Sequence, residues 1–120
     1  ALILAMLAWM GFNYLRIRRA AKIVDNEEFE ALIRTGQLID LRDPAEFHRK
    51  HILGARNIPS SQLKTSLAAL RKDKPVLLYE NQRAQRVTNA ALYLKKQGFS
   101  EIYILSYGLD SWKGKVKVEK

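Results

Sequence analysis

Residues 75–87, PVLLYENQRAQRV, are predicted to form a strand, a polar loop and the start of a helix. The apolar run Val76 to Tyr79 follows a proline and is typical of a strand buried on both faces. From Val87 onward, apolar residues recur at the helical spacing i, i+3, i+4 and i+7. Residues 80–86 therefore lead into a helix N-terminus, where backbone amides and the helix dipole favour an anion. In open α/β sheets such loops lie at the carboxyl ends of the strands, where binding sites are found.

Two upstream segments and one downstream pair of residues extend this pattern. Residues 38–47 are LIDLRDPAEF, residues 51–59 are HILGARNIP, and Gly108 with Trp112 forms a Gly-x-x-x-Trp element. Together with the loop they resemble a rhodanese domain over residues 23–120. The resemblance implies an α/β fold, a three-layer sandwich with about five parallel strands and helices on both faces.

The loop departs from that family at the position that matters most for chemistry. In active rhodaneses it begins with a cysteine, which carries sulfur as a persulfide cradled by loop amides. Here it begins with Glu80 and Asn81, and the chain contains no cysteine. Counting forward from the strand places Glu80 at the nucleophile position, whereas counting back from Arg86 places Asn81 there. Neither a carboxylate nor an amide can form a persulfide, so we predict no catalytic residue and no sulfur transfer by this chain alone.

The loop and one neighbouring strand end supply the predicted site residues. If Glu80 points into the ring of loop amides, its carboxylate acts as a built-in anion paired with Arg86 or Arg83. The alternative is a solvated loop in which Glu80 faces water. Asp40 and Arg42 are expected either to support this site or to form a structural ion pair, and we favour the ion pair. The predicted anion-binding loop comprises Glu80, Asn81, Gln82, Arg83, Ala84, Gln85 and Arg86.

These features predict a catalytically inactive domain that acts as a binding or regulatory module for a protein partner. The alternative is an enzyme of the rhodanese or phosphatase-like superfamily, working with a partner thiol or another substrate. Such an enzyme would be either a relative of the sulfurtransferases or a hydrolase that uses Glu80 as general base or nucleophile. No cofactor is expected. His48 and His51 lie three residues apart, but the chain has no cysteine or third histidine to complete a metal site, so no metal is expected. The resemblance implies instead that His51 forms a hydrogen bond near a strand entry.

The N-terminal segment differs in composition from the rest of the chain. Residues 1–15 carry no charge and are apolar on all sides, and Arg16, Arg18 and Arg19 follow at once. We predict a transmembrane helix over residues 1–17, a basic juxtamembrane linker over 18–22 and the domain over 23–120. Fifteen helical residues span only about 22 Å, so the apolar segment is expected to begin upstream of the given chain. The alternative is a helix packed on the domain.

The charge distribution bears on location and partners. The arginines after the apolar run favour a single-pass protein of the cell membrane whose soluble domain is cytoplasmic. The net charge of +9 comes from dispersed basic residues without interleaved stacking aromatics, so we expect no nucleic-acid partner. Membrane lipid is the partner expected for the N-terminal helix, and the basic stretch that follows it should favour anionic lipid.

Other elements follow from caps and periodicity. Asp25 is predicted to cap a helix that Gly36 ends, and Ser60 or Ser61 to cap another. Pro44 is predicted to open a short helix. The remaining predictions are strands at 23–24, 38–41, 55–58 and 102–105, a short helix at 109–112, and an edge strand at 116–118.

Overall fold

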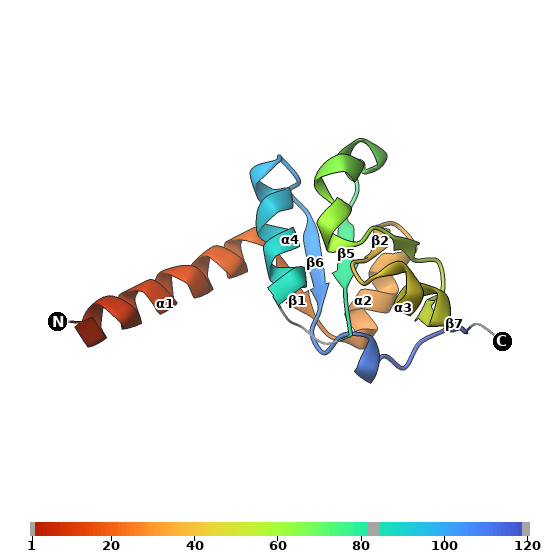
Figure 1. Cartoon of the computed structure of the whole chain (residues 1–120), viewed down its shortest axis with the longest axis horizontal. Coiled ribbons are helices and arrows are strands. Elements are labelled where there is room, and N and C mark those ends of the chain that lie inside the picture. The colour runs from red at the N-terminus through yellow and green to blue at the C-terminus, as the bar shows by residue number, and fades with distance from the viewer. Residues whose placement is uncertain (1, 82–84, 119–120) are drawn as a thin grey trace.

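The central sheet of the computed structural model, which describes residues 2–81 and 85–118, has five parallel strands in the order β1-β6-β5-β2-β4 (Figure 1). β5 lies in the middle of the sheet, and all four of its residues are buried, as its uninterrupted apolar run predicts. The predicted parallel pairing is confirmed for every pair of neighbouring strands in this sheet. The strands are β1 (Lys22–Val24), β2 (Gln37–Asp40), β4 (Arg56–Asn57), β5 (Val76–Tyr79) and β6 (Ile102–Leu105).

Helical segments cover both faces of the sheet, which confirms the three-layer arrangement. On one face, α4 (Gln85–Lys96) packs with two 3-10 segments, η1 (Ser60–Gln62) and η2 (Lys64–Ala69). On the other face, α2 (Asn26–Ile33) and η3 (Leu109–Ser111) enclose a second apolar cluster. α3 (Pro44–Arg49) follows β2, as the proline predicts.

Two predictions for individual elements are corrected by the structure, and one further strand was not predicted. The single helix predicted after Ser60 is two short 3-10 segments instead. The predicted edge strand, β7 (Val116–Val118), pairs antiparallel with β3 (Lys50–Ile52), outside the main sheet. β3 was not predicted because only Ile52 of its three residues is buried, so it carries no apolar run.

The two ends of α2 test the predictions made from Asp25 and Gly36. Asp25 accepts a hydrogen bond from the Glu28 amide at 2.9 Å, as the capping prediction requires. Gly36, predicted to end this helix, lies three residues beyond its last residue, Ile33, and does not have a positive φ. A Cβ there would lie 2.1 Å from the Leu77 Cδ1 atom, so the Leu77 side chain would have to shift to admit it.

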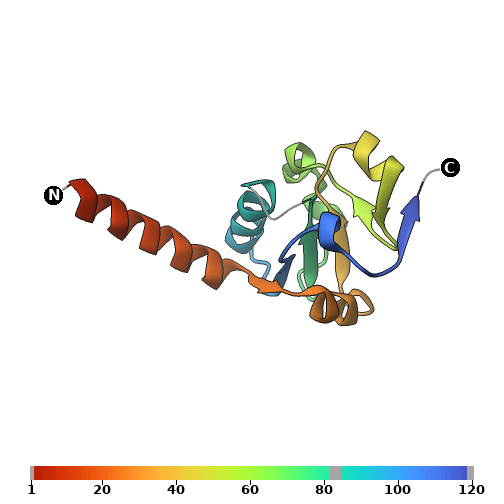
Figure 2. The ribbon, with the colours of Figure 1, turned by 90° about the horizontal axis from the view of Figure 1, so that it is seen from below.

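The N-terminal helix, α1 (Leu2–Ala20), projects away from the sheet, and only its C-terminal end lies beside α4 (Figures 1 and 2). It extends through most of the predicted linker. Its large apolar side chains from Leu2 to Phe12 are exposed, so the alternative of a helix packed on the domain is wrong.

Within residues 2–81 and 85–118, no helix is long and apolar enough to cross a membrane. The transmembrane helix predicted for residues 1–17 is therefore not supported. The physical reason is that α1 carries Arg16, Arg18 and Arg19 in its last turns, and charged side chains are costly within a bilayer core. The predicted membrane location and lipid contact stay predictions.

Candidate functional site

Glu80 lies directly after β5, and its side chain points inward. Its carboxylate Oε2 accepts a hydrogen bond of 2.8 Å from the backbone amide of Val87, in the first turn of α4. The residue is only 8% exposed, so the alternative of a loop with Glu80 facing water is wrong. A carboxylate in this position satisfies a helix N-terminal amide and interacts favourably with the helix dipole. The contact shown is with the backbone of α4 rather than with Arg86.

Asn81 points the other way and joins three elements. Its Oδ1 accepts a hydrogen bond from Arg42 Nη1 at 3.0 Å, and its Nδ2 donates to Glu46 Oε2 at 2.9 Å. The amide oxygen therefore faces a cation and the amide nitrogen faces a carboxylate, which uses both halves of the side chain. This contact ties the loop to the end of β2 and to α3. Glu46 was not predicted as a site residue, because nothing in its local sequence shows that it would meet the loop.

Asp40 and Arg42 form the predicted ion pair at the end of β2, and both are buried. Arg42 Nη2 lies 2.8 Å from Asp40 Oδ2, and Arg42 Nε donates to both carboxylate oxygens. The second donor of Nη2 bonds the Lys50 carbonyl. Burial alone would lower the pKa of Arg42, but the hydrogen bond and charge of Asp40 raise it overall. Arg42 is thus a permanently charged link between Asp40 and Asn81.

Tyr79, the last residue of β5, is fully buried beneath this ion pair. Its Oη accepts a hydrogen bond from the Ile52 amide at 3.0 Å, which connects β5 to β3. Burial, and then the nearby charge of Asp40, raise the pKa of Tyr79 above its ordinary value. The sequence predicts Tyr79 only as part of an apolar strand. The hydrogen bond of its hydroxyl could not be predicted, because the partner Ile52 belongs to β3, which the sequence does not indicate.

Replacing Tyr79 by Phe is expected to change how stability depends on pH. The folded state holds the phenolic proton more tightly than the unfolded chain does. The stability that this tighter proton binding contributes is therefore fully present below about pH 10. Above about pH 10 the unfolded chain loses the proton first, so the free energy of unfolding falls by about 1.4 kcal/mol per pH unit. Tyr79→Phe should remove this loss while costing about 1 kcal/mol at neutral pH through the Ile52 hydrogen bond. Urea unfolding at about pH 8 and about pH 11 measures both effects. Equal losses in the two proteins between these pH values would contradict the prediction.

The segment after β6, which contains Gly108 and η3, borders the site. Its backbone runs against the loop, with the Leu109 amide donating to the Glu80 carbonyl at 2.8 Å and the Asp110 amide to the Asn81 carbonyl at 3.0 Å. Gly108 has a φ of +70° and lies so close to the loop that a Cβ would be 2.4 Å from the Asn81 oxygen. The glycine of the Gly-x-x-x-Trp element is thus explained by close backbone approach.

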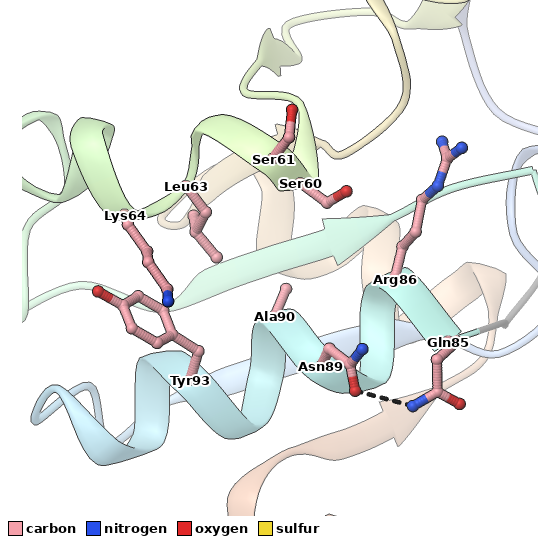
Figure 3. Close-up of a pocket in the computed structure, with 9 residues that line it drawn as sticks. All are labelled: Ser60, Ser61, Leu63, Lys64, Gln85, Arg86, Asn89, Ala90 and Tyr93. Atoms are coloured by element: carbon pink, nitrogen blue, oxygen red, sulfur yellow. Dashed lines mark hydrogen bonds between the residues drawn. The ribbon is translucent and has the colours of Figure 1, made fainter.

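A pocket of about 220 Å³ opens at the carboxyl ends of the strands, where the sequence predicts the site. Its described lining combines the network above with basic residues of α3 and β3 and with the start of η3. Gln85 lies outside it, exposed and bonded to Asn89, and Arg86 lines a separate pocket (Figure 3). Predictions for Gln82, Arg83 and Ala84 fall outside the described residues. The described lining residues are Arg42, Glu46, Arg49, Lys50, Asn81, Leu109 and Asp110.

Neither histidine belongs to a metal cluster in the described part of the chain, where no group of three or more His, Cys, Asp or Glu side chains could hold an ion. His51 Nδ1 lies 2.7 Å from the Phe47 carbonyl, and the two rings stack with centroids 3.8 Å apart. The hydrogen bond predicted for His51 is therefore present, and it closes the turn between α3 and β3.

The parallel sheet and the loop that runs from its central strand to a helix N-terminus define an α/β domain with its site at the carboxyl ends of the strands. Residues 25–115 match the sequence model of the Rhodanese-like domain, and the chain belongs to this family.

The chain resembles proteins with and without an assigned activity. Uncharacterized protein YqhL of Bacillus subtilis (strain 168) is 47% identical over 116 residues, covering 97% of this chain and 91% of its own. Thiosulfate sulfurtransferase GlpE of Stutzerimonas stutzeri (strain A1501) is 36% identical over 95 residues, covering 77% and 84%. The rhodanese-related protein of Thermoplasma volcanium has the same fold, with a TM-score of 0.73, 24% identity, and coverage of 82% of this chain and 99% of its own.

Proposed function

We propose that this chain is a non-catalytic rhodanese-like domain that serves as a binding module for a protein partner. The observation that carries the proposal is the buried Glu80 carboxylate, bonded to the first turn of α4. A helix N-terminus at the end of β5 is where an anion is favoured, and here the chain supplies that anion itself. With no cysteine among its 120 residues, the chain has no thiolate to attack thiosulfate.

The hydrogen bonds around Glu80 and Asn81 support a static role for these two residues. The Asn81 side chain forms hydrogen bonds with both Arg42 and Glu46, and all three residues line the pocket. The loop backbone is bonded to η3 through the Glu80 and Asn81 carbonyls. Glu80 and Asn81 are therefore held from both sides, and residues held in one position suit recognition by a partner. Arg49, Lys50 and Asp110 form the charged rim that such a partner would meet.

The alternative of a hydrolase that uses Glu80 has less support. A nucleophile or general base must reach a substrate atom, whereas the Glu80 side chain is buried and one oxygen is engaged by a helix amide. Nor does Glu80 line the pocket at the carboxyl ends of the strands, as far as its described lining shows.

A matched pair of cysteine variants tests the role of Glu80. Wild type should release no sulfite from thiosulfate and form no thiocyanate with cyanide. Glu80→Cys removes the carboxylate that fills the space beside the α4 amide, so that space becomes open to a thiosulfate anion. The new thiolate should then attack the outer sulfur of thiosulfate, forming a persulfide and releasing sulfite. Cyanide should then take the sulfur as thiocyanate and regenerate the thiolate. Asn81→Cys, whose side chain would face Arg42 and Glu46 rather than the α4 amide, should take up no sulfur.

Intact-protein mass spectrometry detects the persulfide, and circular dichroism checks that both variants are folded. Uptake of sulfur by folded Asn81→Cys but not by Glu80→Cys would show that Asn81 stands where the family nucleophile does. Turnover by the wild-type chain, purified from other thiol proteins, would overturn the non-catalytic assignment.

A further inference from the structure

A second pocket, of about 390 Å³, lies between η1 and α4 (Figure 3). It is larger than the pocket beside Asn81, and the two share no described residue. Its volume falls within the range of small-molecule sites. It is therefore a candidate site separate from the Glu80 loop.

The floor of this pocket is apolar and belongs to the core. Leu63 and Ala90 are 3% and 4% exposed and are part of the apolar cluster on this face of the sheet. The ring of Tyr93 packs against the same cluster. Because the floor is made by core residues packed under helices, it keeps its shape without a ligand. It offers a rigid apolar surface to a flat or aliphatic group.

The ends of the pocket are positively charged. In Figure 3, Lys64 reaches in at one end and Arg86 extends from the first turn of α4 at the other, with Leu63 and Ala90 between them. Lys64 Nζ lies 5.6 Å from the centroid of the Tyr93 ring, a cation–π contact that holds the ammonium over the pocket.

None of the nine described residues that line the pocket is acidic, so neither cation is neutralised within it. Two cations over an apolar floor, with no acidic residue in the described lining, favour a negatively charged occupant. A hydroxyl of Ser60 and the amide of Asn89 add hydrogen-bonding groups at the wall. The combination suits a ligand that is apolar along its body and anionic at an end.

We propose that this pocket binds a small organic anion with an apolar body. The body would lie on Leu63 and Ala90, and the anionic group would be held by Arg86 or Lys64. An inorganic anion has no apolar body to pack on the floor, and a neutral aromatic molecule has no negative charge for Lys64 or Arg86 to bind. The inference does not rest on the role proposed for Glu80.

The test is a titration of the full chain followed by ¹H–¹⁵N NMR, with 1-naphthyl phosphate, 1-naphthol and inorganic phosphate as separate probes. Only 1-naphthyl phosphate should produce saturable shifts of the Leu63, Ala90 and Tyr93 amides. Arg86→Glu and Lys64→Glu should each weaken its binding about tenfold. Lys95→Glu changes the same charge at an exposed position in the last turn of α4, outside the pocket, and should leave the affinity unchanged.

Several outcomes would overturn the proposal. Equal affinity for 1-naphthol would remove the role of charge, and equal affinity for inorganic phosphate would remove the role of the apolar floor. An equal loss in Lys95→Glu would show a general effect of net charge. Shifts confined to α1 would place the binding on its exposed apolar side chains. None of these results would change the outcome of the sulfur-transfer test on Glu80→Cys.

Discussion

Gly108→Ala is expected to lower the free energy of unfolding by about 3 kcal/mol. Part of the loss comes from the backbone of Gly108, whose φ of +70° and ψ of −167° an L side chain adopts only at a cost of about 1–3 kcal/mol. The rest comes from overpacking, since the new Cβ would lie 2.4 Å from the Asn81 oxygen and 2.5 Å from the Glu80 oxygen. These are backbone atoms that also accept hydrogen bonds from η3, so they cannot move without loosening the loop.

Gly54→Ala is the matched control. Gly54 also has a left-handed backbone, with a φ of +92°, but a Cβ there would meet no atom within 4 Å. It should therefore lose only the conformational part, about 1 kcal/mol. Urea unfolding of both variants gives the two free energies. Equal losses would mean that the close approach of the Gly108 segment to the loop contributes nothing.

The second large effect is expected for Asp40→Asn. This substitution keeps the shape of the side chain but removes the negative charge, which leaves the Arg42 guanidinium buried without its ion-pair partner. Breaking a buried pair from one side costs about 3 kcal/mol, because the remaining charge is not solvated. The loop should loosen as well, since Arg42 also holds Asn81.

The chain offers a matched control for this variant too. Arg71 and Asp73 form an ion pair with the same two-residue spacing, but their side chains are 60% and 65% exposed. Asp73→Asn should change stability little, because water and salt already screen that pair. The double variant Asp40→Asn/Arg42→Met should recover part of the loss by removing the buried charge. A loss in Asp73→Asn as large as in Asp40→Asn, in urea unfolding, would contradict the role given to burial.

Much of this protein follows from local sequence. The apolar runs at 76–79 and 102–105 predict buried strands, and the helical spacing from Val87 predicts α4, because periodicity reports which faces are buried. The order of these elements predicts a parallel sheet with the loop at its carboxyl edge. Composition is equally direct, since a chain without cysteine has no thiolate whatever its fold.

Other features depend on contacts between residues far apart in the chain. That Glu80 turns toward the Val87 amide while Asn81 turns toward Arg42 and Glu46 could not be chosen from the sequence, which left both at the nucleophile position. The strand β3 is defined by pairing with β7, about 65 residues later, and not by its own apolar pattern. The membrane-spanning helix was inferred from an uncharged run whose helix also includes three arginines.

The chemistry available at the end of β5 was therefore determined by the sequence, because side-chain type alone decides whether a sulfur nucleophile exists. Which side chain fills the helix N-terminus was decided only by the tertiary structure. A loop side chain takes the direction in which its polar atoms find partners, and those partners are brought together by β2, α3 and α4.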